Sequence, residues 1–252
     1  MFIDKQKTLK KIINFLKKEF KKRKKKTAIL AVSGGIDSAL CAYLCKEADL
    51  DFYAVILPYK KSGAEGEKLA KALGLAKNHI IKIDIASLVD SAQREISKFI
   101  KMDQKDKGNI MARERMVIQY ALARKLKGLV IGTENLSEYY LGYFTLFGDQ
   151  ACDISPIAGL LKTQVRELAE YISVPQWVLD KVPTAGLWPG QTDEKEFGFT
   201  YRDADLVIYY SIIKKQPREE LIKKGLSSKI IDKVLNRVKE TGYKREASPK
   251  CV

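Results

Sequence analysis

Residues 33–38 read Ser33-Gly34-Gly35-Ile36-Asp37-Ser38, between an apolar run at 27–32 and a helical pattern at 38–48. Two consecutive glycines allow a tight turn that points several backbone N–H groups into one concavity. That concavity lies at a helix N-terminus, where the helix dipole and the free N–H groups favour an anion. The sequence therefore predicts a phosphate-binding loop between the first strand and the helix that follows it.

Asp37 adds a requirement to this loop. A carboxylate repels a bare phosphate, so its position predicts a bridging Mg²⁺ ion. The loop matches neither the G-x-x-x-x-G-K-[ST] pattern nor the G-x-G-x-x-G pattern of other nucleotide sites. An ordinary glycine turn, with Asp37 as the helix cap, is the alternative. The complete hexapeptide directly after the first strand favours the phosphate loop.

Strand and helix patterns alternate along the chain around this loop. Apolar runs predict strands at 27–32, 51–57, 79–85 and 128–131, and helical patterns separate them. This alternation is typical of a doubly wound, mostly parallel sheet with helices on both faces, an α/β fold. Ligands of such sheets bind at the carboxyl ends of the strands.

No repeat or low-complexity linker interrupts the chain, so we expect one domain over residues 1–252. Residues 1–26 carry Leu9, Ile12, Ile13, Leu16 and Phe20 at helical spacing among lysines, which predicts an amphipathic basic helix. Residues 214–252 form a basic helical tail after the last predicted strand.

The net charge of +15 is concentrated at the two ends of the chain. Residues 1–26 hold 12 basic and 2 acidic side chains, and residues 214–252 hold 12 basic and 5 acidic ones. The middle, with 22 basic and 24 acidic side chains, is close to neutral. We therefore interpret the ends as solvated helical faces and expect no specific nucleic-acid partner.

The composition also indicates the cellular compartment in which the protein acts. The apolar runs are too short to span a bilayer, and lysines interrupt the N-terminal apolar residues, unlike a signal peptide. Four cysteines without a C-x-x-C pair, together with a single histidine, argue against zinc and disulfides. A cytoplasmic protein without membrane contact is the expectation.

The hexapeptide resembles the S-G-G-x-D-S signature of the N-type ATP pyrophosphatases, which cleave ATP between the α- and β-phosphates and transfer AMP. Further segments are similar to motifs of the NAD synthetases in this superfamily, in the same order along the chain. These are residues 108–116 (GNIMARERM), 131–138 (IGTENLSE), 142–157 (GYFTLFGDQACDISPI), 183–194 (PTAGLWPGQTDE) and 244–249 (KREASP).

The resemblance to the ammonia-dependent NAD synthetases implies the fold and the reaction. The fold would be adenine nucleotide alpha hydrolase-like. The reaction would be the ATP-dependent amidation of deamido-NAD with ammonia, through an acyl-adenylate, with release of AMP and pyrophosphate. Mg²⁺ would assist, and the protein would be a homodimer.

The same resemblance implies roles for individual residues. Lys162 and Asp153 would be catalytic, and Asp37 and Glu138 would bind Mg²⁺. Residues implied to bind ATP are Ala31, Val32, Ser33, Gly34, Gly35, Ile36, Asp37, Ser38, Thr133, Lys162 and Thr184. Residues implied to bind deamido-NAD are Arg113, Leu146, Asp153, Tyr243 and Lys244.

The chain departs from the family pattern in three places. Leu146 stands where many members have lysine, Gln150-Ala151 replaces a second glycine, and Tyr243 replaces the histidine of a His-Lys pair. All three fall on the side implied to bind the dinucleotide.

Two alternatives stay open at this point. A tRNA-modifying pyrophosphatase would suit the basic ends, and so would a basic nucleic-acid-binding protein without catalysis.

The predicted domain fills the chain and leaves no room for a glutaminase, whose nucleophile is typically a cysteine. We therefore expect ammonia, and not glutamine, as the nitrogen source.

Overall fold

The computed structural model describes residues 3–188 and 190–251 of the chain. Four strands form a parallel sheet in the order β3-β2-β1-β4. Each strand lies where the sequence predicts one and is slightly shorter, β3 most of all. The bounds are Thr27–Ala31 for β1, Asp51–Ile56 for β2, Ile80–Lys82 for β3 and Leu129–Ile131 for β4.

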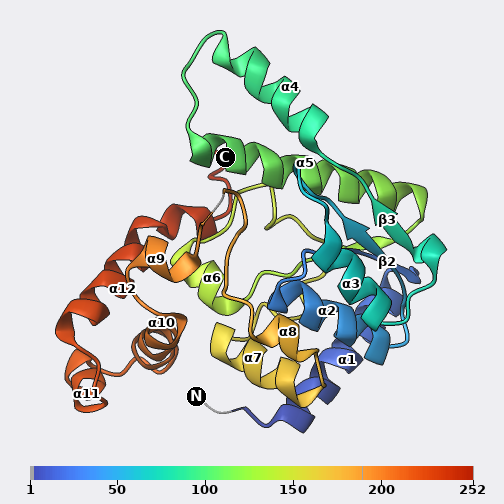
Figure 1. Ribbon diagram of the computed structural model, residues 1–252. Coiled ribbons are helices and arrows are strands. Elements are labelled where there is room, and N and C mark those ends of the chain that lie inside the picture. Colours follow the sequence, from blue (N-terminus) through green and yellow to red (C-terminus); the bar gives the residue numbers. More distant parts are fainter. Residues whose placement is uncertain (1–2, 189, 252) are drawn as a thin grey trace.

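Side chains of the strands alternate between the two faces of the sheet. Ala28 and Leu30 pack in one buried cluster with helices α1, α2, α3, α7 and α8, whereas Ile29 packs in another with α4 and α5. Figure 1 shows α4 lying along α5, apart from the other group. The sheet is thus covered on both faces, as the alternation of strands and helices predicts.

These helices lie where the sequence shows most of its helical patterns. They are Lys5–Lys22 for α1, Ile36–Glu47 for α2, Ala64–Ala72 for α3, Ala86–Ser97 for α4, Gln104–Lys125 for α5, Lys162–Tyr171 for α7 and Gln176–Leu179 for α8. A short 3₁₀ helix, Lys77–His79, precedes β3.

The N-terminal helix α1 lies within the basic segment 1–26. Ile12, Leu16 and Phe20 are buried in the core, while Lys17 and Lys18 between them are exposed. The helix is therefore anchored by an apolar stripe and presents a basic face to solvent. Residues 1–2 of the segment lie outside the described residues.

Helix α6, drawn in yellow-green in Figure 1, and the helices of the C-terminal third, drawn in orange and red, form a separate helical group. It buries a separate apolar cluster that includes Leu141, Val207 and Ile231. Predicted tail residues 214–252 fall largely on its last helices, and residue 252 lies outside the described part. The bounds are Leu136–Leu141 for α6, Asp193–Phe197 for α9, Tyr201–Val207 for α10, Ile208–Ile213 for a π-helix, Arg218–Lys223 for α11, Ser228–Glu240 for α12 and Gly242–Arg245 for a last 3₁₀ helix.

The strand order reverses between β1 and β4. The chain runs from β1 outward to β2 and β3, and then returns to place β4 on the other side of β1. Loops that follow β1 and β4 therefore leave the sheet in different directions, and a crevice opens between them at the carboxyl ends of the strands. These loops are residues 33–38, the predicted phosphate loop, and residues 132–135.

Across residues 3–188 and 190–251, the helices are all too short or too polar to traverse a bilayer.

Candidate active site

The glycine loop joins β1 to α2 as predicted. Gly34 has a φ of +79°, a left-handed conformation that favours glycine, and Gly35 is the N-cap of α2. Inside the loop, the Ser38 hydroxyl donates to the Gly35 carbonyl over 3.0 Å and lies 3.1 Å from the Ser33 hydroxyl. Because Gly35 has no side chain to cap the helix, the first N–H groups of α2 remain available for an anion.

Two carboxylates next to this loop converge on one lysine. Lys162 Nζ, at the start of α7, lies 2.5 Å from Asp37 Oδ2 and 2.9 Å from Glu138 Oε1. Asn135 Nδ2 donates to the other oxygen of Asp37 over 2.8 Å, and its own Oδ1 accepts from the Glu138 N–H and caps α6. Three residues that are far apart in the sequence therefore meet at the switch point.

The charges at this point are strongly coupled. Burial alone would lower the pKa of Lys162, but the carboxylates of Asp37 and Glu138 hold that pKa above its usual range. Lys162 therefore stays positively charged and neutralises part of the negative charge of the pair. A buried cation between two carboxylates is stable only while all three remain paired.

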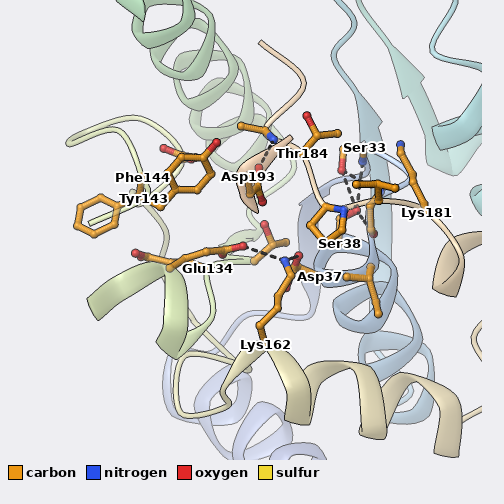
Figure 2. Close-up of a pocket in the computed structure, with 18 residues that line it drawn as sticks. Ser33, Asp37, Ser38, Glu134, Tyr143, Phe144, Lys162, Lys181, Thr184 and Asp193 are labelled. Carbon is orange, nitrogen blue, oxygen red and sulfur yellow. Dashed lines mark hydrogen bonds and ion pairs between the residues drawn. The ribbon is translucent and has the colours of Figure 1, made fainter. Parts of the chain in front are cut away.

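These groups border a cavity of about 190 Å³. In Figure 2, Ser33, Ser38 and Lys181 lie on one side of the cavity, and Tyr143 and Phe144 lie on the opposite side. The lining comes from residues within segments 33–38, 133–138, 143–149 and 181–185, together with Lys162 and Asp193.

Most of the residues implied to bind ATP line this cavity: Ser33, Gly35, Ile36, Asp37, Ser38, Thr133, Lys162 and Thr184. Glu138, the second carboxylate implied for Mg²⁺, lines it as well. Ala31 ends β1 and Val32 is buried behind the loop, so these two support the loop from the sheet side. Gly34 packs against α3.

Asp153 has a backbone partner in the structure. Its Oδ2 accepts from the Val130 N–H over 2.8 Å, while the Asp153 N–H donates to the Val130 carbonyl over 2.9 Å. The residue therefore ties the segment around residue 153 to β4. It lies beside the crevice and is not among the residues that line the cavity.

The residues implied to bind deamido-NAD gather around the loop at 142–149. Arg113 Nε donates to the Leu146 carbonyl over 3.3 Å, which joins α5 to this loop. Lys244 Nζ donates to the carbonyls of Gly142 and Phe144 over 2.8 and 2.6 Å. Tyr243 is 64% exposed beside it. Three elements distant in sequence, α5, this loop and the 3₁₀ helix Gly242–Arg245, thus form one wall.

Basic residues of the C-terminal tail hold the end of α6. Arg237 Nε donates to the Leu141 carbonyl over 3.0 Å, and Arg245 Nη1 donates to the Tyr140 carbonyl over 2.7 Å. Cations at a helix C-terminus satisfy its free carbonyls and complement its dipole. Part of the positive charge in the tail therefore has a structural role next to the cavity.

Several lining residues carry chemistry that the sequence analysis did not assign: Glu134, Tyr143, Asp149, Lys181 and Asp193. Glu134 follows Thr133 within a recognised motif, and that adjacency was the available signal. Asp149 accepts from the Thr145 N–H over 2.6 Å and so shapes the loop. Lys181 follows α8 and carried no sequence signal.

Glu134 is the most perturbed of these carboxyl groups. Its Oε1 is buried and has no hydrogen-bond partner among the described residues. Burial raises the pKa of Glu134 to about 8, with a further increase from the charges of Glu138 and Asp149 and a partial opposition from Lys244. Glu134 is therefore largely protonated at neutral pH.

The doubly wound parallel sheet, with this serine-glycine loop at its switch point, agrees with the class of N-type ATP pyrophosphatases that the hexapeptide resembles. The family model described as NAD synthase matches residues 8–248. The chain belongs to the NAD synthase family.

Individual relatives agree with this assignment. The chain is 38% identical to the NH(3)-dependent NAD(+) synthetase of Fusobacterium nucleatum over 237 residues, which cover 93% of this chain and 91% of that protein. Among solved structures, NMN synthetase from Francisella tularensis superposes with a TM-score of 0.86 at 32% identity, covering 99% of both chains. NH3-dependent NAD synthetase from Campylobacter jejuni superposes with 0.81 at 28% identity, covering 99% of this chain and 100% of that one.

Glu134 predicts a pH dependence of stability. The unfolded chain loses this proton near the ordinary pKa of 4.5, and the folded protein loses it only near 8. Between these values the folded state binds more protons, so the free energy of unfolding falls as the pH rises. The slope from this group is at most about 1.4 kcal/mol per pH unit. Urea unfolding of Glu134→Gln should lack this component.

The exposed Glu47 on α2 offers a matched control. Glu47→Gln should keep the wild-type dependence of the unfolding free energy on pH. Identical pH profiles for wild type and Glu134→Gln would contradict the raised pKa.

Proposed function

We propose that this chain converts deamido-NAD to NAD with ATP and ammonia. The observation that carries the proposal is the meeting of Asp37, Glu138 and Lys162 at the glycine loop. The names of the relatives favour this reaction over the tRNA-modifying and nucleic-acid-binding alternatives. The acceptor carboxylate would first take AMP from ATP and release pyrophosphate, and ammonia would then displace AMP.

The ATP side of the proposal rests on the loop and on the residues that face it. The N–H groups at the start of α2 and the hydroxyls of Ser33 and Ser38 would surround the phosphates. Thr133 and Thr184, which line the same cavity from other segments, would donate to ATP. Lys162 would contribute a fixed positive charge where negative charge develops during the transfer of AMP.

The carboxylates fit Mg²⁺. Asp37 and Glu138 both approach a single cation, Lys162 Nζ, within 2.9 Å, so their oxygens are already arranged around one positive charge. No group of three or more His, Cys, Asp or Glu side chains among the described residues could hold a metal alone. Mg²⁺ commonly binds through one or two carboxylates plus substrate phosphates, and it would neutralise phosphate charge here.

The acceptor would bind at the wall formed around residues 142–149. Arg113, Leu146, Tyr243 and Lys244 gather there, and Asp153 lies at the edge of β4 beside the crevice. Arg113 supplies positive charge that a diphosphate requires. We expect the protein to act in the cytoplasm. Its proposed substrates, ATP and deamido-NAD, and its free cysteines suit that compartment.

A second candidate acceptor is the mononucleotide that lacks the AMP half of deamido-NAD. Two observations favour it. The structure that superposes with a TM-score of 0.86 is named an NMN synthetase. The three departures from the NAD synthetase pattern, Leu146, Gln150-Ala151 and Tyr243, all fall on the acceptor side. The ATP chemistry would be the same for both acceptors.

A homodimer is also proposed, as the family resemblance implies. Large apolar side chains are exposed on α4 and just after it: Ile96 at 41%, Phe99 at 90% and Ile100 at 66%. Val117 on the adjacent α5 is 53% exposed. Large exposed apolar side chains of this kind are typical of a protein interface.

A coupled assay tests the reaction. Purified protein with ATP, Mg²⁺ and ammonium should form the amide product from deamido-NAD, and omission of any one component should abolish it. Glutamine alone should not support synthesis, and the ammonium requirement should ease toward about pH 9, because ammonia is the nucleophile. Parallel reactions with nicotinate mononucleotide decide between the two acceptors. Absence of AMP release with either acceptor would contradict the proposal.

Asp37→Asn tests the loop. The substitution is isosteric and removes a charge proposed to bind Mg²⁺, so kcat should fall by about a hundredfold or more. Asp49→Asn, in the turn after α2, is the matched control and should keep wild-type activity. Near-normal turnover of a folded Asp37→Asn protein with Mg²⁺ would refute the metal role.

The dimer is tested by sedimentation. Phe99→Asp combined with Ile100→Asp should convert the dimer to a monomer, since charge would enter an apolar interface. Ile222→Asp, on the exposed side of α11, should leave the dimer intact. A wild-type protein that sediments as a monomer at micromolar concentration would disprove this part.

A further inference from the structure

Lys181 lies at the rim of the cavity, opposite the aromatic side chains (Figure 2). It follows α8 and begins the segment 181–185 that lines the cavity together with Thr184. Its Nζ forms an ion pair with Glu65 Oε2, on the first turn of α3. The side chain of Lys181 is 27% exposed and that of Glu65 is 58% exposed. This ion pair ties the segment 181–185 to α3.

Glu65 lies directly against the glycine loop. A Cβ atom placed on Gly34 would be 2.6 Å from Glu65 Cβ and 3.4 Å from Glu65 Oε2. Gly34 therefore lacks room for a side chain because of Glu65, in addition to its positive φ. The consequence is electrostatic: a carboxylate stands beside the loop on which the ATP phosphates are proposed to bind.

The lysines that line the cavity differ in what they can do. Lys162 is buried and is held by Asp37 and Glu138, so a new anion would have to compete with two carboxylates. Among the described residues, Lys181 Nζ pairs with Glu65, whose side chain is more than half exposed, and such pairs contribute little to stability, about 0–1 kcal/mol. Among the lining residues, Lys181 is therefore the cation that an incoming polyphosphate can redirect most readily.

We propose that Lys181 binds the ATP phosphates and that Glu65 competes for it in the ATP-free protein. The inference rests on the proposed function only in assuming that ATP binds at residues 33–38. On binding, the phosphates replace Glu65 as the partner of Lys181, and the segment 181–185 is drawn against the nucleotide. That segment carries Thr184, so one ion-pair exchange positions two proposed ATP contacts.

Calorimetric titration with ATP and Mg²⁺ tests this inference, because the two partners should have opposite effects. Lys181→Gln removes the cation and should weaken ATP binding about tenfold, as loss of a charged hydrogen bond does. Glu65→Gln removes the competitor and should tighten ATP binding about two- to fivefold. Glu65→Gln should tighten ATP binding less in the Lys181→Gln background than in the wild type, since only the direct repulsion between Glu65 and the phosphates would remain to be relieved there.

A neighbouring ion pair between β3 and α3 provides a matched control. Lys82 Nζ lies 2.7 Å from Glu67 Oε1 and is not among the residues that line the cavity. Lys82→Gln makes the same change of charge in the same kind of pair and should leave ATP affinity unchanged. Melting temperatures of all variants report whether each one folds.

The opposite result would overturn the inference. A purely structural ion pair predicts that Lys181→Gln and Glu65→Gln weaken ATP binding alike, or that neither changes it. Failure of the proposed function is a different result: the variants would shift ATP affinity as expected while the wild type released no AMP with either acceptor.

Discussion

One buried cation holds the site and part of the fold together. Lys162, at the start of α7, pairs with Asp37 in the first turn of α2 and with Glu138 in the first turn of α6. The helix after β1 and the helix after β4 are therefore joined through the charged amino group of Lys162. Breaking a buried pair by removing one partner typically costs about 3–5 kcal/mol, because the remaining charge is uncompensated. The geometry proposed for ATP chemistry and the stability of the switch point are consequently coupled.

The lysine is itself positioned from the C-terminal helices. Its backbone N–H donates to the Ser137 hydroxyl over 2.8 Å, and Ser137 in turn donates to Asp205 on α10. Asp205 also accepts from the Thr163 N–H over 2.8 Å, so a carboxylate lies at the N-terminus of α7 where the helix dipole favours it. The separate apolar cluster of the C-terminal third thereby fixes the start of α7, and with it Lys162.

The sequence predicted the sheet and its loop because both are local patterns: short apolar runs, a pair of glycines and the helix behind them. It did not predict α6, since Leu136–Leu141 is too short for a helical period to appear. Most of the residues implied to bind ATP line the cavity, because their motif fixes them next to the strand ends. Glu65 and Lys181 could not be found this way, as their pairing depends on how α3 and the segment after α8 pack in three dimensions.

The two sides of the cavity are built differently, and this bears on how the chain departs from its family. The glycine loop is held by the sheet, by α3 against Gly34 and by Lys162, so a substitution there would disturb several buried contacts. At Leu146 the loop at 142–149 is held through a backbone carbonyl, by Arg113, and Lys244 likewise holds the carbonyls of Gly142 and Phe144. Backbone contacts tolerate changes of side chain, and leucine can therefore stand at position 146, where the resemblance implies a lysine, while the loop keeps its path. The physical constraint is strict where ATP is proposed to bind and looser where the acceptor is proposed to bind, so the side chains that select the acceptor can change without altering the loop proposed to hold ATP.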